Sequence, residues 1–391
     1  MSGVAPAGPV RLLITNFHSG DSGGHRTYVE TLATRLSPRY ERFVACPDTS
    51  DVYASLAGAE LPGRLIAEPF PAKPRELIKV LEGIARFKRL LRELRPALIH
   101  VNGSPDHRMV MFATFGAATR PRIVLTKHNT IPVKTGLSSW VRARSFTDHV
   151  IAVGPSAAAV IKASPYRAAP VTVVPNGINL SVFRPCSDDE RAQARRNYGI
   201  PQDAIVLVSV AGTGHHKGWW VLTQALQSLP RELRNRFRVL IAGMPLEPAS
   251  IARECGTLTV EGVVRFLGKL DRVVELIHSA DAGFVLSYGV ETISFACREV
   301  MACGLPVLVS DYADLPGNVA DGVEGWIVGV RDVRQVSVWL HRAAQGAFDL
   351  RAIGRAARLR AQREFGVEAM IAATEAVYEA TLRASDSSIG G

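Results

Sequence analysis

Cysteine is scarce in this sequence, with five residues among 391. The five are scattered, at Cys46, Cys186, Cys255, Cys297 and Cys303. No two of them form a Cys-x-x-Cys pair, and no histidines accompany them at the spacing of a zinc site. This pattern excludes a zinc module or a small disulfide-linked scaffold as the basis of the fold, and it favours a reducing compartment.

Long apolar runs are also missing. A helix that crosses a bilayer needs about 18 or more consecutive apolar residues, and no segment approaches that length. The first residues show no basic stretch followed by an apolar core, so we expect no signal peptide and a cytoplasmic location.

Aromatic residues make up only 7% of the sequence, and the net charge of +10 is unevenly spread. Residues 1–185 are basic, whereas the remainder is slightly acidic. A basic half is compatible with nucleic acid, an anionic membrane or a phosphorylated substrate. The low aromatic content argues against the stacking surface of a nucleic-acid binder, so we expect no nucleic-acid partner.

The common nucleotide-binding glycine motifs are absent. The loop after a first strand at residues 11–15 contains Gly20, Gly23 and Gly24, which do not form Gly-x-Gly-x-x-Gly. A second segment begins with Gly212-x-Gly214 but has Lys217 at the position of the third glycine. This disfavours a nicotinamide oxidoreductase. An Asp-x-Asp pair is missing too, so we expect no metal site of that kind.

What is present is a regular alternation of short apolar runs and amphipathic segments. Strands are predicted in two sets, at residues 11–15, 43–46, 97–101, 123–126 and 149–153, and then at 204–210, 237–242, 282–286 and 307–309. This rhythm predicts an α/β protein with parallel sheets, and the length suits two domains. Residues 76–94 form a basic amphipathic helix, which is either an ordinary surface helix or a face that rests on an anionic membrane.

The most informative stretch is Ser287–Ser310, which reads as a strand end, a loop, a helix and the next strand. Glu291 lies in the loop and Glu299 lies inside the helix, with the free N–H groups of a helix N-terminus between them. Such amides suit a diphosphate, and carboxylates accept hydrogen bonds from sugar hydroxyls. From spacing alone, two solvated acids at a helix start remain an alternative.

The whole stretch resembles the two-glutamate motif of the retaining GT-B glycosyltransferases (glycosyltransferase group 1, or family 4-like), continued here by Glu299-Val-Met-Ala-Cys-Gly-Leu-Pro-Val307. Val171–Pro185 resembles the segment that links the two domains of that family. The resemblance implies two Rossmann-like domains facing across a cleft. We expect an acceptor-side domain at 1–180, a donor domain at 181–366, and a helix and tail at 367–391 that return to the first domain.

The resemblance also implies roles for individual residues. Glu299 would hold the donor ribose, Glu291 the donor sugar and Lys217 the diphosphate, and both Glu291 and Lys217 would have catalytic roles. The remaining donor contacts would come from Gly23, Gly24, Thr213, Arg265, Leu267, Ser294, Phe295 and Ala296, and His128 would lie near the donor sugar with a catalytic role. The sequence departs from the family in holding Thr213 at the place of an arginine, and Thr292-Ile293-Ser294 at the place of Gly-Phe-Gly. Asp106, His107 and Arg108 follow a strand end, and we expect them to contact the acceptor.

The implied reaction is the retaining, metal-independent transfer of a sugar from a nucleoside diphosphate sugar, most commonly a UDP-sugar, to an acceptor hydroxyl. The acceptor would be a saccharide or a lipid-linked molecule, as in bacterial surface polysaccharide or lipopolysaccharide synthesis at the cytoplasmic face of the membrane. No cofactor is expected beyond the donor itself. A GT-B enzyme that hydrolyses or epimerises its nucleotide sugar is the main alternative, and a basic nucleic-acid-binding protein is a more distant one.

Overall fold

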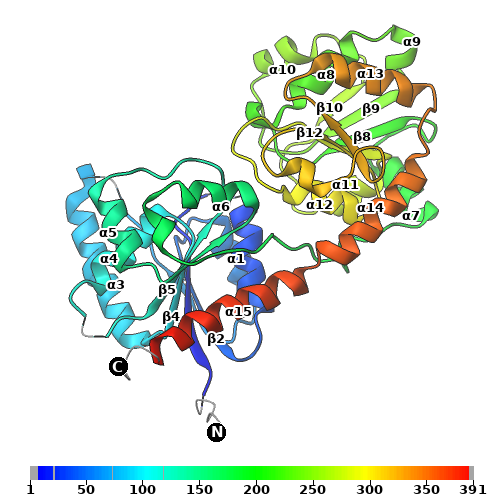
Figure 1. Ribbon diagram of the computed structural model, residues 1–391. Coiled ribbons are helices and arrows are strands. Elements are labelled where there is room, and N and C mark those ends of the chain that lie inside the picture. Colours follow the sequence, from blue (N-terminus) through cyan, green and yellow to red (C-terminus); the bar gives the residue numbers. More distant parts are fainter. Residues whose placement is uncertain (1–7, 21–22, 73, 118, 387–391) are drawn as a thin grey trace. The chain divides into compact units, whose positions relative to one another are not determined.

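The chain folds into two α/β units, seen in a computed structural model that describes residues 8–20, 23–72, 74–117 and 119–386 (Figure 1). Unit 1 comprises residues 1–175 and 370–391, and unit 2 comprises residues 176–369. The division falls after Pro175, five residues before the boundary expected from the sequence. The expected C-terminal tail lies largely outside the described residues.

Unit 1 is built on a parallel sheet of seven strands within the described residues, in the order β3-β2-β1-β4-β5-β6-β7. Its strands are β1 (Val10–Thr15), β2 (Tyr40–Cys46), β3 (Leu65–Ala67), β4 (Leu98–Val101), β5 (Arg122–Lys127), β6 (His149–Ala152) and β7 (Val171–Val173). The connecting helices are α1 (Gly24–Arg35), α2 (Asp51–Leu56), η1 (Pro74–Glu76), α3 (Leu77–Leu94), α4 (Ser104–Thr114), α5 (Leu137–Ser145), α6 (Pro155–Lys162) and η2 (Pro165–Ala168).

Unit 2 repeats the plan with a parallel sheet in the order β10-β9-β8-β11-β12-β13. Its strands are β8 (Ile205–Ser209), β9 (Phe237–Ile241), β10 (Val264–Phe266), β11 (Ala282–Val285), β12 (Val307–Ser310) and β13 (Gly325–Val328). Its helices are α7 (Asp188–Asn197), η3 (His215–Lys217), α8 (Trp219–Gln227), α9 (Arg231–Arg234), α10 (Pro248–Cys255), α11 (Val274–His278), α12 (Phe295–Ala302), η4 (Leu315–Asn318), α13 (Val333–Ala344) and α14 (Leu350–Glu364). The prediction of an α/β protein with two parallel sheets is confirmed.

The apolar runs of the sequence become strands buried on both faces, as parallel sheets require. In β1, for example, Leu12, Leu13 and Ile14 are all fully buried. In each sheet the strand order reverses once, between β1 and β4 in unit 1 and between β8 and β11 in unit 2. Ligands of open α/β sheets bind at such reversal points, outside the carboxyl ends of the strands.

The last helix, α15 (Val367–Asp386), begins in unit 2 and belongs to unit 1 from Met370 onward. Tyr378 is fully buried, and its hydroxyl lies 2.5 Å from Nδ1 of His100 on β4. The other ring nitrogen of His100 lies 2.6 Å from the Thr126 hydroxyl on β5. This buried chain of hydrogen bonds fixes the returning helix on the sheet of unit 1, in agreement with the expected crossing.

Helix α3 departs from the simple amphipathic pattern. Its second half is buried as expected, through Phe87, Leu90 and Leu94. Its first turns instead expose Leu77, Ile78 and Leu81, with 60%, 73% and 57% of their surfaces accessible. This end of the helix therefore presents apolar side chains to the surroundings, which packing within unit 1 does not explain.

Candidate functional site

The site in unit 2 lies at the reversal point of its sheet. Lys217 ends the short helix η3 that follows β8, and Glu291 lies in the loop that follows β11, the neighbouring strand. The Lys217 ammonium Nζ donates to Glu291 Oε2 at 2.9 Å. Ser287 Oγ donates to the same oxygen at 3.2 Å. Because Glu291 is only 8% exposed, its carboxylate is held rigidly by these two donors.

The two loops that carry this pair are joined along their backbones. The Tyr288 N–H donates to the His216 carbonyl at 2.9 Å. Gly218 has a φ of +72°, and a Cβ atom there would lie 1.9 Å from the Leu286 carbonyl oxygen. Only glycine permits this approach. The sequence Lys217-Gly218 therefore places the lysine directly against the strand end that leads to Glu291.

Helix α12 begins three residues after Glu291 with a strained N-cap. Ser294 has a φ of 54° and a ψ of 113°, and its side chain accepts a hydrogen bond from the Cys297 N–H. Val290 is also in the positive-φ region, at 52°. Ser294 stands where the family usually has glycine, and its backbone keeps a conformation that suits glycine. Strain of this kind is common in ligand-binding loops.

Glu299 lies in the second turn of α12, eight residues after Glu291, and is half-buried. Burial raises the pKa of its carboxyl to about 7. No cation or hydrogen-bond donor of the described residues compensates for this burial. A carboxyl without a protein partner on this helix can accept hydrogen bonds from a pair of vicinal hydroxyls, as the resemblance implies for a ribose.

Thr213 does not replace the missing arginine. It is buried, its hydroxyl donates to the Met244 carbonyl at 2.5 Å, and its own carbonyl accepts from the Trp219 indole at 2.8 Å. Of the two histidines in this turn, His215 stacks on Trp220 at 5.3 Å between ring centroids. His216 is the one beside the pair: burial and Lys217 lower its pKa, and Glu291 acts in the opposite direction. His216 is therefore neutral at pH 7.

Arg265 and Leu267 were expected to line a base pocket, and the structure gives them other contacts. The Arg265 guanidinium donates to the Tyr198 carbonyl, at the end of α7. The Leu267 side chain packs with the apolar cluster around Ile200 and Leu276, and its N–H donates to Ile241. Neither side chain is brought to Lys217 and Glu291, so their expected donor contacts stay predictions.

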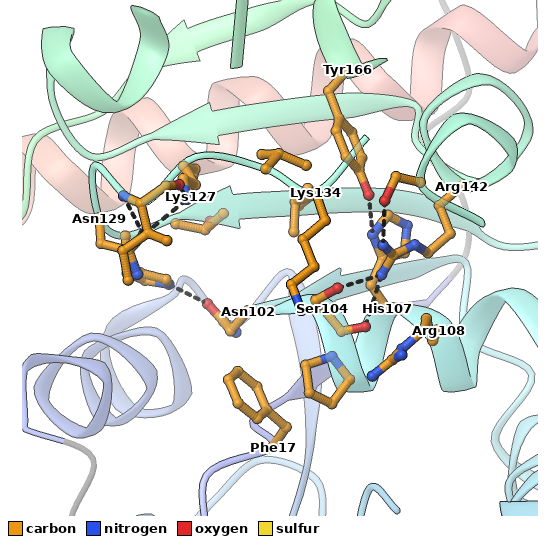
Figure 2. A pocket seen from close by; sticks show the side chains of 18 of the residues that line it. Phe17, Asn102, Ser104, His107, Arg108, Lys127, Asn129, Lys134, Arg142 and Tyr166 are labelled. Carbon is orange, nitrogen blue, oxygen red and sulfur yellow. Dashed lines mark hydrogen bonds between the residues drawn. The ribbon is translucent and has the colours of Figure 1, made fainter. Parts of the chain in front are cut away.

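Unit 1 has a cavity of about 560 Å³ beyond the carboxyl ends of β1, β4 and β5 (Figure 2). Its wall is formed mainly by the loop after β1, the start of α4, the loop after β5 and the first turns of α5, with further contributions from Ile161 on α6 and Tyr166 on η2. Asn102 fixes the centre, because its amide donates to the Thr15 carbonyl at 2.8 Å and its oxygen accepts from His128 Nε2 at 2.9 Å.

The three expected acceptor residues differ in their placement. Arg108 is half-buried and lines the cavity. His107 also contributes to the wall, but its Nε2 donates to the Phe146 carbonyl at 2.7 Å, and burial lowers its pKa to about 3. Asp106 does not line the cavity: it is fully buried and accepts from the Thr15 hydroxyl and the Asn102 N–H. The geometry therefore gives Asp106 a positioning role under the wall.

His128 follows β5 and lies in the cavity wall, where burial and the neighbouring His25 lower its pKa far below the ordinary value. It is a neutral imidazole that donates to Asn102. Gly23 precedes α1 with a φ of 52° and a ψ of −125°, which favours glycine, and Gly24 is the first residue of that helix. Residues 21–22 of the same loop lie outside the described part of the chain.

Two cavity residues were not anticipated from the sequence. Lys134 projects into the cavity from the loop after β5, and Arg142 reaches it from α5 (Figure 2). Lys134 could have been found by extending the inspection of polar residues beyond the end of β5. Arg142 carried no such signal, because an arginine in the middle of a helix usually points to solvent.

Comparison with known proteins finds two glycosyltransferase family matches, one for each half of the chain. Residues 22–182 match the family described as Glycosyltransferase Family 4, and residues 190–359 match Glycosyl transferases group 1. Two D-inositol 3-phosphate glycosyltransferases are similar in sequence. The protein from Streptomyces bingchenggensis is 31% identical, in a match that covers 54% of this chain and 48% of that relative. The protein from Saccharomonospora viridis is 35% identical, in a match that covers 51% of this chain and 48% of that relative. The chain thus spans about half the length of the curated relatives it matches.

Solved structures share the architecture at low sequence identity. HepE of Anabaena, in complex with UDP and glucose, superposes with a TM-score of 0.80 and 17% identity, over 95% of this chain and 99% of that one. Sucrose-phosphate synthase from Thermosynechococcus elongatus superposes with a TM-score of 0.75 and 20% sequence identity. The match covers 96% of this chain and 100% of that one. These likenesses establish the fold. With the two family matches, they show that the chain belongs to the group 1 glycosyltransferases and has their two-domain GT-B fold.

Proposed function

We propose that the protein transfers a sugar from a nucleoside diphosphate sugar to an acceptor hydroxyl. The observation that carries this proposal is the group at the reversal point of unit 2: Lys217 held by Glu291, the N-terminus of α12, and the uncompensated Glu299. A cation and free amides suit a diphosphate, and the two carboxyls suit hydroxyls on either side of it.

In this reaction the acceptor oxygen attacks the anomeric carbon while the bond from that carbon to the diphosphate breaks. The acceptor proton passes to the departing phosphate, and the nucleoside diphosphate leaves with it. Because the acceptor attacks from the same face of the sugar that the diphosphate leaves, the anomeric configuration is retained. Lys217 and the α12 amides stabilise the charge that develops on the leaving group. His128, being neutral, is suited to hydrogen-bond a sugar hydroxyl.

The donor that we propose first is a UDP-sugar. The similarity of the fold to HepE, which was solved with UDP and glucose, supports this choice, as does the family resemblance. For the acceptor we propose a saccharide or a lipid-linked molecule of a bacterial surface polysaccharide or lipopolysaccharide. WaaG, a structural neighbour with a TM-score of 0.68, is described as involved in lipopolysaccharide biosynthesis.

A thermal-shift screen against nucleoside diphosphate sugars tests the proposal, since a ligand that binds only the folded state stabilises it. We expect UDP-sugars to raise Tm in the parent and to raise it less in Glu299→Ala. Product analysis then separates the activities. Sugar transferred only when acceptor is present supports the transferase, whereas free sugar or an epimer formed without acceptor supports the alternative.

Association with an anionic membrane is proposed for the exposed start of α3. Leu77, Ile78 and Leu81 project from a helix whose outer face also carries exposed Lys79, Lys88 and Arg89. Apolar side chains can enter the headgroup region while lysines pair with lipid phosphates. No helix in the described part of the chain is long and apolar enough to span a bilayer. Flotation with anionic liposomes tests this: parent protein should float, and a variant with serine at all three apolar positions should not.

A further inference from the structure

The turn that carries Lys217 has little support of its own. Helix η3 is a single turn between Gly214 and Gly218, and none of its three residues is buried. Within the turn, the Lys217 N–H donates to the Gly214 carbonyl at 2.8 Å, and the Gly218 N–H donates to the His215 carbonyl at 3.1 Å. Because glycine permits many backbone conformations, a turn bounded by two glycines keeps one position only if neighbouring elements hold it.

Tyr288 supplies two such contacts from the loop after β11. Its backbone N–H donates to the His216 carbonyl at 2.9 Å, and its hydroxyl lies 2.5 Å from Nδ1 of His215. The other ring nitrogen of His215 lies 3.7 Å from a carboxylate oxygen of Glu254, which favours the tautomer with its hydrogen on Nε2. Nδ1 then accepts a hydrogen bond from the Tyr288 hydroxyl. Tyr288 therefore holds the two residues that directly precede Lys217.

The ring of Tyr288 is packed among three side chains. It meets the rings of His215 and Trp220 edge-on, at 6.1 and 6.2 Å between centroids. The guanidinium carbon of Arg331, from the loop after β13, lies 3.8 Å from the centroid of the Tyr288 ring. A cation over an aromatic face is an attractive contact, so Arg331 keeps the ring in the orientation in which its hydroxyl reaches His215.

We propose that Tyr288 is a positioning residue for Lys217, and that Arg331 supports it through the tyrosine ring. The inference rests on the proposed function for the role of Lys217 at the donor diphosphate, but the placement of the turn follows from the contacts alone. At one end of η3, Lys217 is paired with Glu291. At the other end, Tyr288 holds the two histidines. Without the tyrosine hydroxyl the ammonium would sit on a less firmly held turn and would stabilise the leaving group less well.

The first test measures the placement of Lys217 without donor or acceptor. Acetic anhydride at limiting concentration acetylates lysines of the folded full chain, and peptide mass spectrometry compares the rate at Lys217 with that at the exposed Lys88. The ion pair with Glu291 protects the Lys217 ammonium, so a displaced turn makes it react faster. We expect Tyr288→Phe to raise the relative rate by about five-fold, as loss of one hydrogen bond would.

Two further variants control this measurement. Tyr198 is a half-buried tyrosine at the end of α7, which leads to the amino end of β8, whereas Lys217 follows the carboxyl end of that strand. Tyr198→Phe should leave the Lys217 rate unchanged. His215→Phe keeps a ring beside Trp220 and removes Nδ1, so it should act as Tyr288→Phe does. It also keeps the test valid if Tyr288→Phe does not fold.

The second test separates positioning from a direct contact or a general loss of structure. UDP is titrated calorimetrically into the parent, Tyr288→Phe, Lys217→Ala and the double variant. We expect Tyr288→Phe to weaken UDP binding by about five-fold in the parent background. It should have no further effect in Lys217→Ala, because it acts through the lysine. Equal effects in both backgrounds would contradict the positioning role.

Arg331 is tested by the same acetylation. Arg331→Met should raise the Lys217 rate by about two-fold, as loss of an exposed cation–π contact would. It should add nothing in Tyr288→Leu, which lacks the ring, and a rise that persists there would refute the role of Arg331. An unchanged Lys217 rate in both Tyr288→Phe and His215→Phe would overturn the whole proposal, as would an equal rise in Tyr198→Phe. If acetylation changes as expected but the parent does not bind UDP, only the proposed function fails.

Discussion

The Lys217 ammonium and the Glu291 carboxylate lie 2.9 Å apart, at the ends of two neighbouring strands in the sheet of unit 2. The two residues are 74 positions apart in the sequence. Both side chains are largely buried, with 20% and 10% of their surfaces exposed. The pair therefore fixes a cation at the reversal point of the sheet, where a diphosphate would bind.

Replacing Lys217 tests whether this cation acts on the reaction. We expect Lys217→Ala to lower kcat by about 100-fold, because a preorganised charge on the leaving group is lost. It should also reduce the free energy of unfolding by about 1–3 kcal/mol, since Glu291 is left without its cation. Steady-state kinetics and urea unfolding measure the two effects. Arg334→Ala removes an exposed charge from α13 as a control, and equal behaviour of the two variants would refute the assignment.

The raised pKa of Glu299 predicts a pH dependence. Its carboxyl titrates at about 7 in the folded chain and at 4.5 ordinarily, so folding favours the protonated form. Parent stability should therefore fall, relative to Glu299→Gln, as the pH rises from about 4.5 to above 7. The difference should reach about 3 kcal/mol. Chemical unfolding of both proteins between pH 4 and pH 9 measures it, and a constant difference would contradict the predicted burial.

Donor affinity should change in the opposite direction. An ionised carboxylate accepts hydrogen bonds from two hydroxyls better than a protonated one, so the parent should bind donor more tightly above pH 7 than below it. Glu299→Gln should bind weakly, with little dependence on pH in this range. Titration of UDP-glucose at pH 6 and pH 8 provides the measurement, and the same pH response in both proteins would exclude Glu299 as its origin.

Gly218 and Gly268 offer a matched pair for the tight approach of the two loops. Both have a φ of +72°, but a Cβ atom at Gly218 would meet the Leu286 carbonyl at 1.9 Å, whereas at Gly268 it would meet nothing within 4 Å. We expect Gly268→Ala to cost about 1 kcal/mol from backbone strain alone. Gly218→Ala should cost more than about 3 kcal/mol and should also displace Lys217. Thermal unfolding of the two variants measures this difference. Similar losses of stability in Gly218→Ala and Gly268→Ala would contradict the close approach of Gly218 to Leu286.

Ser294 gives a prediction with the opposite sign. A serine at a φ of 54° and a ψ of 113° is strained, and glycine would relieve that strain by about 1–2 kcal/mol. Replacing a serine N-cap by glycine costs only a few tenths of a kcal/mol through loss of the hydroxyl. Ser294→Gly should thus stabilise the protein by about 1 kcal/mol while Ser294→Ala destabilises it. A lower Tm for the glycine variant would mean that the hydroxyl has a further role.

Much of the unit 2 site could be predicted because it is encoded locally. The helix start at Ser294, the loop position of Glu291 and the helical position of Glu299 all follow from one continuous stretch of 24 residues with clear turn and cap signals. The Lys217–Glu291 contact could not be predicted from spacing, because it depends on β8 and β11 becoming neighbours. Arg265 shows another limit: the resemblance implies a donor contact for it, but its guanidinium donates to the Tyr198 carbonyl at the end of α7.

The cavity of unit 1 was less accessible to sequence reasoning. Its wall is assembled from segments that lie far apart in the sequence, and Arg142 enters it from a helix face that looks ordinary in the sequence. The triplet Asp106-His107-Arg108 was noticed because it follows a strand, but helical geometry points successive residues in different directions, so only Arg108 presents its charge to the cavity. Leu77 and Leu81 of α3 continue the apolar periodicity of this helix and yet are exposed, because the periodicity extends beyond the part that unit 1 covers.

The most direct measurement of the central claim is a calorimetric titration of UDP-glucose and UDP into the parent, Glu299→Ala and Arg334→Ala at pH 8. We expect one site per chain in the parent and in Arg334→Ala, and at least about ten-fold weaker binding in Glu299→Ala, because the ribose hydroxyls lose their acceptor. If the parent binds these ligands and Glu299→Ala binds them with equal affinity, Glu299 does not hold the donor ribose.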